Sequence, residues 1–268
     1  MTTLNPVRNI GSLLDYSDEF PDEITAREVA KAFFDSPIIT DYSQVRNLFE
    51  TTLERISQNY PENPSHFTMK DREVKVLTTE QIIAYDPRHQ PTFYAEKNSP
   101  SSLNRTTNSF CKHNGNRNFT LVLPFLPRPL FFSKLAHEYG HTLLDGTCKD
   151  RIREEQIAIT FQEYFLRELC ASGEYSLEEA MGIEKIQSSK GLKRSESPGS
   201  QILILSYPKN SLHDLARERM RRLFRELRNQ PNRPNNKDIW LNMLDIATGN
   251  ILRQKTQTRT NHSSEVCV

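Results

Sequence analysis

Cysteine is scarce in this chain and is never paired in sequence. The 268 residues include four cysteines without a C-x-x-C pair, namely Cys111, Cys148, Cys170 and Cys267. This spacing supplies neither a disulfide framework nor a zinc ribbon, and it favours a reducing compartment. The chain is long enough to bury a core without disulfides.

A long apolar segment is also missing. The most apolar run, "FTLVLPFLPRPLFF" (119–132), is too short and too often interrupted by proline to span a bilayer. The first twenty residues lack the charged-then-apolar pattern of a signal peptide. We therefore expect a soluble cytoplasmic protein with no membrane partner, although export without a cleavable signal stays open.

The charge balance gives no bias toward polyanions. Formal net charge is +1, from 35 basic and 34 acidic residues, so nucleic acid is not expected as a partner except through a local patch. One such patch is an arginine-rich helical stripe at 217–228, which Glu218 and Glu226 dilute. A solvated helix face is the preferred interpretation over a phosphate or acidic partner, and the role of the stripe stays open.

Periodicity and composition divide the chain into five segments. Residues 1–68 have helical patterns, 69–187 combine strands with helices, and "SSKGLKRSESPGS" lies in a linker at 188–210. Residues 211–254 form a helical region, and 255–268 form a polar tail that we expect to be disordered. The predicted fold class is α+β, with helical additions at both ends.

Two helices in the first segment leave a DNA-binding alternative open. One is expected at 24–34 and the other near 45–56, where Asp41 or Ser43 supplies the cap and apolar residues recur at helical spacing. Such a pair could be a helix-turn-helix, but plain packing is the commoner use of two adjacent helices. The basic residues there are balanced by acids.

Three strand patterns come next, and two helices follow them. The strand patterns are 73–79, 92–97 and 118–125, of which "NFTLVLPF" is the strongest. A helix then begins at Pro129 and ends in a turn near Gly146, and a long helix is expected from about Asp150 to Ala171. The strongest strand therefore lies beside the first helix, where an extended peptide could add to it by main-chain pairing.

The first of these helices contains "HEYGH". His137 and His141 are four residues apart and share one helix face, so both imidazoles can bind one ion. Glu138 is about 100° away and can reach a water on that ion without binding the ion itself. Gly140 leaves space beside the second histidine for a substrate or a packed strand. The alternative is an ordinary histidine pair with no special chemistry.

A catalytic zinc needs a third protein ligand, and the next helix begins "RIREEQIAITFQEYFLREL". Glu154 shares a face with Ala158, Phe161 and Phe165, so periodicity turns it toward the core, whereas Glu155 is about 100° away from that stripe. Two aspartates remain possible, Asp145 and Asp150. Periodicity alone does not choose among these four.

The stretch "FFSKLAHEYGHTLLDG" with "EEQIAITFQEYFL" resembles the ImmA/IrrE metallopeptidase family of gluzincins, over roughly 118–166. That family has H-E-x-G-H after a strand, then a helix with E-x-x-A-x-x-F, whose glutamate is the third ligand. The resemblance therefore implies Glu155 as the ligand, with Ala158 and Phe161 completing the pattern. The chain departs from the family at Ile159, where asparagine is common.

The sequence and the resemblance together predict a zincin-like metalloendopeptidase domain, with a small sheet, the HExxH helix and the ligand helix. One Zn²⁺ per chain would be held by His137, His141 and Glu155, and Glu138 would be the general base toward a zinc-activated water. The resemblance implies limited, regulatory cleavage of a protein or peptide substrate. The alternatives are an inactive zincin-fold binding module and the DNA-binding regulator. The oligomeric state is left open.

Several other polar side chains have weaker claims on the site. His213 opens the C-terminal helix and could stabilise a transition-state oxyanion if that helix folds over the site; a cap or surface role is preferred. Tyr94 is a further possible donor to an oxyanion. Four histidines lie in polar surroundings and are expected to be solvated, namely His66, His89, His113 and His262.

Overall fold

The computed structural model describes residues 36–87, 109–115, 117–144, 148–173, 212–230 and 236–254. Within these ranges the protein combines small sheets with several helices, which confirms the predicted α+β class. No helix in these ranges has the length and apolarity needed to cross a membrane. Several predictions fall outside the described residues, namely the helix at 24–34, the strand at 92–97, the linker, the tail, Tyr94, Asp145, His89 and His262.

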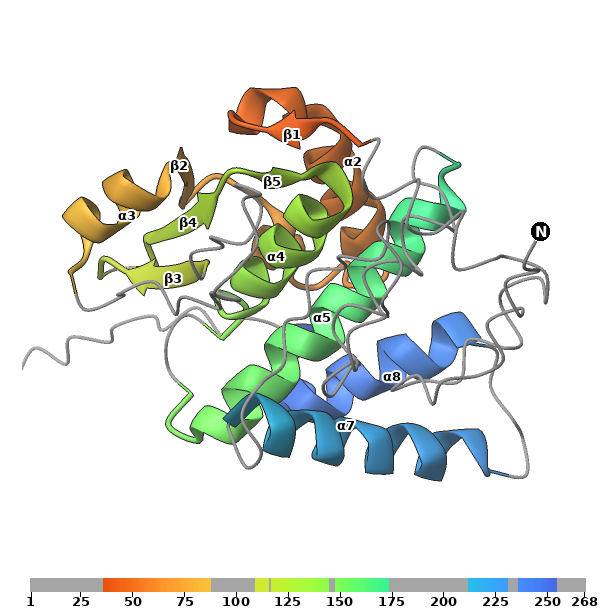
Figure 1. Cartoon of the computed structure of the whole chain (residues 1–268). Coiled ribbons are helices and arrows are strands. Elements are labelled where there is room, and N and C mark those ends of the chain that lie inside the picture. Colours follow the sequence, from red (N-terminus) through yellow and green to blue (C-terminus); the bar gives the residue numbers. More distant parts are fainter. Residues whose placement is uncertain are drawn as a thin grey trace, which may run out of the picture.

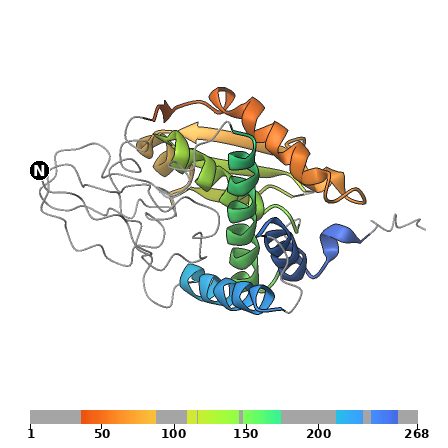
Figure 2. The same ribbon diagram turned by 90° about the vertical axis from the view of Figure 1, so that its right-hand side faces the viewer.

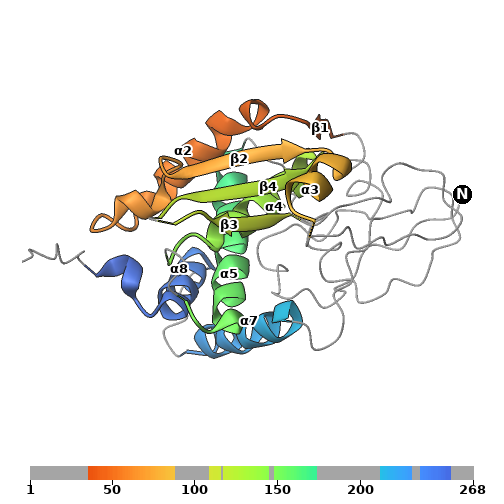
Figure 3. The same cartoon turned by 90° about the vertical axis from the view of Figure 1, so that its left-hand side faces the viewer.

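The main sheet has three strands in the order β2-β4-β3 (Figure 3). The central strand β4 (Phe119–Pro124) is parallel to β2 (Arg72–Leu77) and antiparallel to β3 (Phe110–His113). Every residue of β4 is buried, because helices cover both of its faces. Since β4 pairs on both sides, the predicted addition of a peptide to this strand is wrong, and the edge strands of this sheet among the described residues are β2 and β3.

The two faces of β4 meet different clusters. Leu121 and Leu123 point into the main core, whereas Val122 packs with Ile82 of α3 (Thr79–Tyr85) in a small separate cluster. Thr78 caps α3 through its side chain, which accepts a hydrogen bond from the backbone N–H of Gln81. The alternation of Leu121, Val122 and Leu123 between the two clusters is the period of two expected along a strand with both faces covered.

A short antiparallel pair of strands fixes the start of α4 (Arg128–Gly140), the helix that contains His137 and Glu138. β1 (Ile38–Ile39) pairs with β5 (Leu126–Pro127), and the backbone N–H of Arg128 donates to Pro37 O at 2.9 Å. From β1 the chain enters η2 (Tyr42–Gln44), capped by Asp41, then α2 (Arg46–Ser57) and η3 (Pro64–Phe67). The predicted apolar stripe of α2 is buried at Phe49, Leu53 and Ile56.

The helix α5 (Arg151–Ala171) lies at the centre of the molecule. It contacts α4 (Arg128–Gly140) on one side and both α7 (Leu212–Arg228) and α8 (Asn236–Thr248) on the other (Figure 1). It runs across the directions of the strands and of α7 (Figure 2). After α8 the chain forms η5 (Ile251–Arg253). Because α5 contacts both α4 and α7, side chains from all three helices can meet at its surface.

Aromatic rings fill the junction of α4, α5 and the N-terminal elements. Tyr139 of α4 stacks on Phe161 of α5 with ring centroids 5.3 Å apart, and Phe161 also faces Phe67 at 6.3 Å. Phe49 of α2 lies 4.6 Å from Phe165. The same core continues to Trp240 of α8. Offset aromatic pairs of this kind add to the free energy gained by burial alone, and here they fix α4 against α5.

Candidate metal centre

The C-terminal end of α4 is anchored by the loop around η3 and by β2. His141 is the C-cap of α4, and the turn after it is fixed because the His66 ring contacts Leu143 O at 3.1 Å. Arg72 Nε donates to Thr142 Oγ1 at 2.6 Å. The predicted solvation of His66 is therefore wrong, and the helix ends before the expected Gly146. These contacts anchor the turn that follows His141.

The start of α5 has its own cap. Asp150 accepts hydrogen bonds from the backbone N–H groups of Ile152 and Arg153, at 3.0 and 3.2 Å. Its second oxygen lies 3.2 Å from Arg219 of α7, which ties that helix to this end of α5. Asp150 was one of the possible ligands, but its carboxylate serves as an N-cap. The first turns of α5 that follow this cap place the carboxylates of Glu154 and Glu155 beside the end of α4.

Three of the predicted site residues come together at this junction. His137 Nε2 lies 3.3 Å from His141 Nε2 and 3.5 Å from Glu155 Oε2. The other oxygen, Glu155 Oε1, lies 3.9 Å from His141 Nε2. The two imidazoles from α4 and the carboxylate from α5 therefore face one common point.

Glu154 lies at the same site but on its outer side. Its Oε1 is 3.3 Å from Nδ1 of His141, and its side chain is 35% exposed against 15% for Glu155. The prediction that Glu154 points into the core is wrong, because its helix stripe faces α4 where α4 presents His141 instead of an apolar residue. A carboxylate at Nδ1 favours a proton there and leaves Nε2 with its lone pair.

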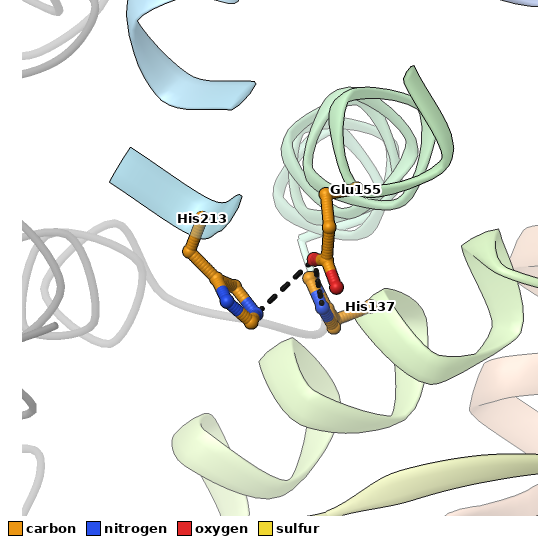
Figure 4. A group of neighbouring side chains, drawn as sticks. All are labelled: His137, Glu155 and His213. Atoms are coloured by element: carbon orange, nitrogen blue, oxygen red, sulfur yellow. Dashed lines mark ion pairs between the residues drawn. The ribbon is translucent and has the colours of Figure 1, made fainter. Parts of the chain in front are cut away.

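His213 lies at the site, although the sequence favours a cap or surface role for it. It lies in the first turn of α7, with Nε2 3.1 Å from Glu155 Oε2, and its ring stacks on that of His137 with centroids 5.6 Å apart. Figure 4 shows His213 pointing toward His137 and Glu155 from a third helix. The preferred cap or surface role is therefore wrong. No local spacing reveals this contact, which depends on α7 folding over α5.

Burial keeps two of the imidazoles neutral. It lowers the pKa of His137 to about 4, and burial together with the neighbouring His137 lowers the pKa of His213 to about 4. Burial opposes ionisation of Glu155, but contact with His137 and the nearby histidines lower its pKa to about 2. At neutral pH the group therefore offers nitrogen lone pairs and one carboxylate, which are the protonation states that metal binding requires.

His141 differs from the other two histidines. Burial alone would lower its pKa, but the Glu154 contact and the charges of Glu138 and Glu155 outweigh burial and raise that pKa. A proton held on the ring is directed to Nδ1, because Glu154 lies on that side. Nε2 is then left to face His137.

Glu138 is buried beside this group, with 4% of its surface exposed. Ser109, which precedes β3, donates from Oγ to Glu138 Oε1 at 2.6 Å. Burial raises the pKa of Glu138, as expected for a carboxylate that takes up protons. The contact of Ser109 could not be predicted from the sequence, because a single serine before a short strand carries no distinguishing pattern.

Gly140 allows α4 and α5 to approach each other closely at the site. A Cβ built on Gly140 would lie 2.6 Å from Cα and 3.1 Å from O of Ala158. The predicted neighbour, a substrate or a strand, is therefore wrong, because the backbone of α5 fills this space. The short separation of the two helices brings Glu155 within reach of both histidines.

We expect Gly140→Ala to destabilise the protein even though alanine has the higher helix propensity. Propensity favours alanine by about 1 kcal/mol, but overpacking against a rigid backbone costs about 1–3 kcal/mol. Chemical denaturation should show a net loss of unfolding free energy. Since the clash involves the backbone of residue 158, adding Ala158→Gly should give no rescue. A stabilised Gly140→Ala variant would contradict the close approach of the two helices.

The dimensions of this group fit a tetrahedral zinc ion. With Zn–N bonds of about 2.0–2.1 Å, two nitrogens of a tetrahedral site lie about 3.3–3.4 Å apart. The His137–His141 distance of 3.3 Å meets this value. Glu155 Oε2 is buried and has no hydrogen-bond partner among the described residues. An oxygen atom that binds a cation is expected to have this environment. Comparisons of this chain with protein-family models, with curated proteins and with solved structures find no match.

Proposed function

We propose that this protein is a zinc-dependent metallopeptidase with a zincin-like fold, in which His137, His141 and Glu155 bind the ion and Glu138 is the general base. The observation that carries this proposal is the convergence of three donor side chains from two helices, with 3.3 Å between the two imidazole nitrogens and 3.5 and 3.9 Å from these nitrogens to the Glu155 carboxylate. The resemblance of the motif to ImmA/IrrE metallopeptidases gives further support. That resemblance also suggests limited cleavage of a protein substrate, an argument by analogy.

The protein supplies the proton transfers of peptide hydrolysis. A zinc ion held here supplies Lewis acidity at neutral pH. Glu138 takes a proton from the attacking water and passes it to the leaving amine nitrogen. Ser109 holds Oε1 of Glu138 by a hydrogen bond, which orients the carboxylate and leaves Oε2 for the proton.

Glu154 contacts the Nδ1 side of the His141 ring, away from the candidate metal position. The family commonly has asparagine at the position of Ile159, and Ile159 is buried in the core here. The 3.3 Å contact between Glu154 Oε1 and His141 Nδ1 supplies an acceptor of the same kind. A carboxylate in this position orients a metal-binding imidazole and raises its basicity.

The substrate would bind along β3. Among the described strands β3 pairs only with β4, so within the described part of the chain no strand occupies its other edge, which could pair with an extended peptide. The strand begins next to Ser109, whose side chain contacts Glu138. A peptide added to this edge would therefore run past the general base.

The metal content of purified protein tests the ligand set. Elemental analysis should find about one zinc per chain in wild type, and both His141→Ala and Glu155→Ala should lose it, because each removes a donor from the common point. Glu154→Ala should retain zinc with weaker affinity, by about 10–100-fold. Zinc retained in Glu155→Ala but lost in Glu154→Ala would transfer the ligand role to Glu154. A wild type that binds no zinc after reconstitution would contradict the peptidase proposal.

A further inference from the structure

Two sets of three donors overlap at the candidate metal centre. One is the set His137, His141 and Glu155. The other is His137, Glu155 and His213, whose ligand atoms all lie within 4.8 Å of one another. The two sets share the His137–Glu155 pair, so one ion bound beside that pair would have candidate donors from α4, α5 and α7.

We propose that His213 is a fourth protein ligand of the ion, so that the first turn of α7 closes the resting site. This inference rests on the proposed metallopeptidase function. A zinc site with four protein ligands is closed, whereas a catalytic site keeps one position open. The resting protein is therefore latent, and the open position appears when His213 leaves the ion.

The position of His213 matches a ligand more closely than a donor to an oxyanion. His213 Nε2 lies 3.1 Å from Glu155 Oε2, close to the edge length of a tetrahedral site. A group that stabilises an oxyanion lies one hydrogen bond, about 2.7–3.1 Å, beyond the fourth position, and so farther from Glu155. The close contact is also not a hydrogen bond, since Oε2 has no such partner among the described residues.

The first turn of α7 is suited to release its histidine. Met220 and Phe224, farther along α7, are buried in the main core, and Arg219 is tied to Asp150. The first turn itself exposes Leu212 and Leu215, by 37% and 40%. Among the described side chains of α7, the buried ones begin at Ala216, behind this turn. A substrate or another ligand for the ion can therefore displace His213 by moving the first turn alone.

Cobalt-substituted protein tests this proposal without a substrate. We would load full-length wild type, His213→Ala and the control Leu215→Ala with Co²⁺. Affinity is measured by competition with a chelator, and the visible cobalt absorption is followed during titration with acetohydroxamate, which needs an open position. Wild type and Leu215→Ala should bind Co²⁺ alike and resist acetohydroxamate. His213→Ala should bind Co²⁺ at least about tenfold more weakly and should take up acetohydroxamate with a clear spectral change.

The results distinguish failure of the fourth-ligand role of His213 from failure of the metallopeptidase proposal. Equal Co²⁺ affinity and equal response to acetohydroxamate in wild type and His213→Ala would overturn the fourth-ligand assignment and leave the peptidase proposal intact. Loss of Co²⁺ binding in His141→Ala, measured beside them, verifies that the ion occupies the predicted site. A wild type that binds no ion would overturn both proposals.

Discussion

Glu138→Gln should lower peptide hydrolysis by about 10²–10⁴-fold, the contribution expected of one general acid–base group. The amide cannot accept the proton of the attacking water, yet it has nearly the shape of the carboxylate and can keep the 2.6 Å hydrogen bond from Ser109. The loss should appear in kcat, with zinc content unchanged. Hydrolysis of a mixed library of quenched fluorescent peptides measures the effect, both in wild type and in a His213→Ala background where the metal position is open.

Glu54→Gln on the exposed face of α2 is the matched control, because it makes the same chemical change away from the site. It should leave hydrolysis unchanged. Equal hydrolysis by Glu138→Gln and wild type would remove Glu138 from the mechanism. Zinc binding with no hydrolysis, even in His213→Ala, would instead favour the rival interpretation of an inactive binding module on this scaffold.

The local part of the site could be predicted from sequence. Residues four apart on a helix share a face, so the pairing of His137 with His141 follows from spacing alone. The choice of Glu155 over Glu154 needed the family resemblance, because periodicity gave Glu154 the wrong environment. The stripe of α5 does face α4, but at the first turn its neighbour is His141 rather than an apolar side chain.

Long-range contacts were beyond this kind of prediction. His213 reaches Glu155 only because Met220, Phe224 and the rest of the α7 apolar face pack on α5, and the order of packed helices is not encoded in any spacing. Ser109 is likewise set by the pairing of β3 with β4. The position of β4 in the middle of the sheet also depends on strand order, which its sequence does not reveal.

The pattern E-x-x-A-x-x-F acquires a physical meaning in the structure. Glu155 faces the two histidines, Ala158 lies against Gly140, and Phe161 stacks on Tyr139. The three residues therefore lie along one contact line between α4 and α5, with the candidate metal donors at one end. Small residues bring the helices close, and aromatic packing maintains the helix separation at which Glu155 reaches the two histidines.

Phe161→Ala should lower the free energy of unfolding by about 3–5 kcal/mol, the cost of truncating a fully buried phenylalanine. Its side chain is 0% exposed and contacts aromatic rings from α4 and η3. Chemical denaturation of metal-free protein measures the loss, and the exposed Phe125→Ala, 41% accessible, should stay within about 0.5 kcal/mol of wild type. Because a zinc ion held by His137, His141 and Glu155 would bridge the same two helices, zinc at 100 times its Kd should restore about 2.7 kcal/mol. The same addition should restore nothing when His141→Ala is combined with Phe161→Ala. Equal rescue of the two proteins would show that zinc stabilises the fold from some place other than the α4–α5 junction.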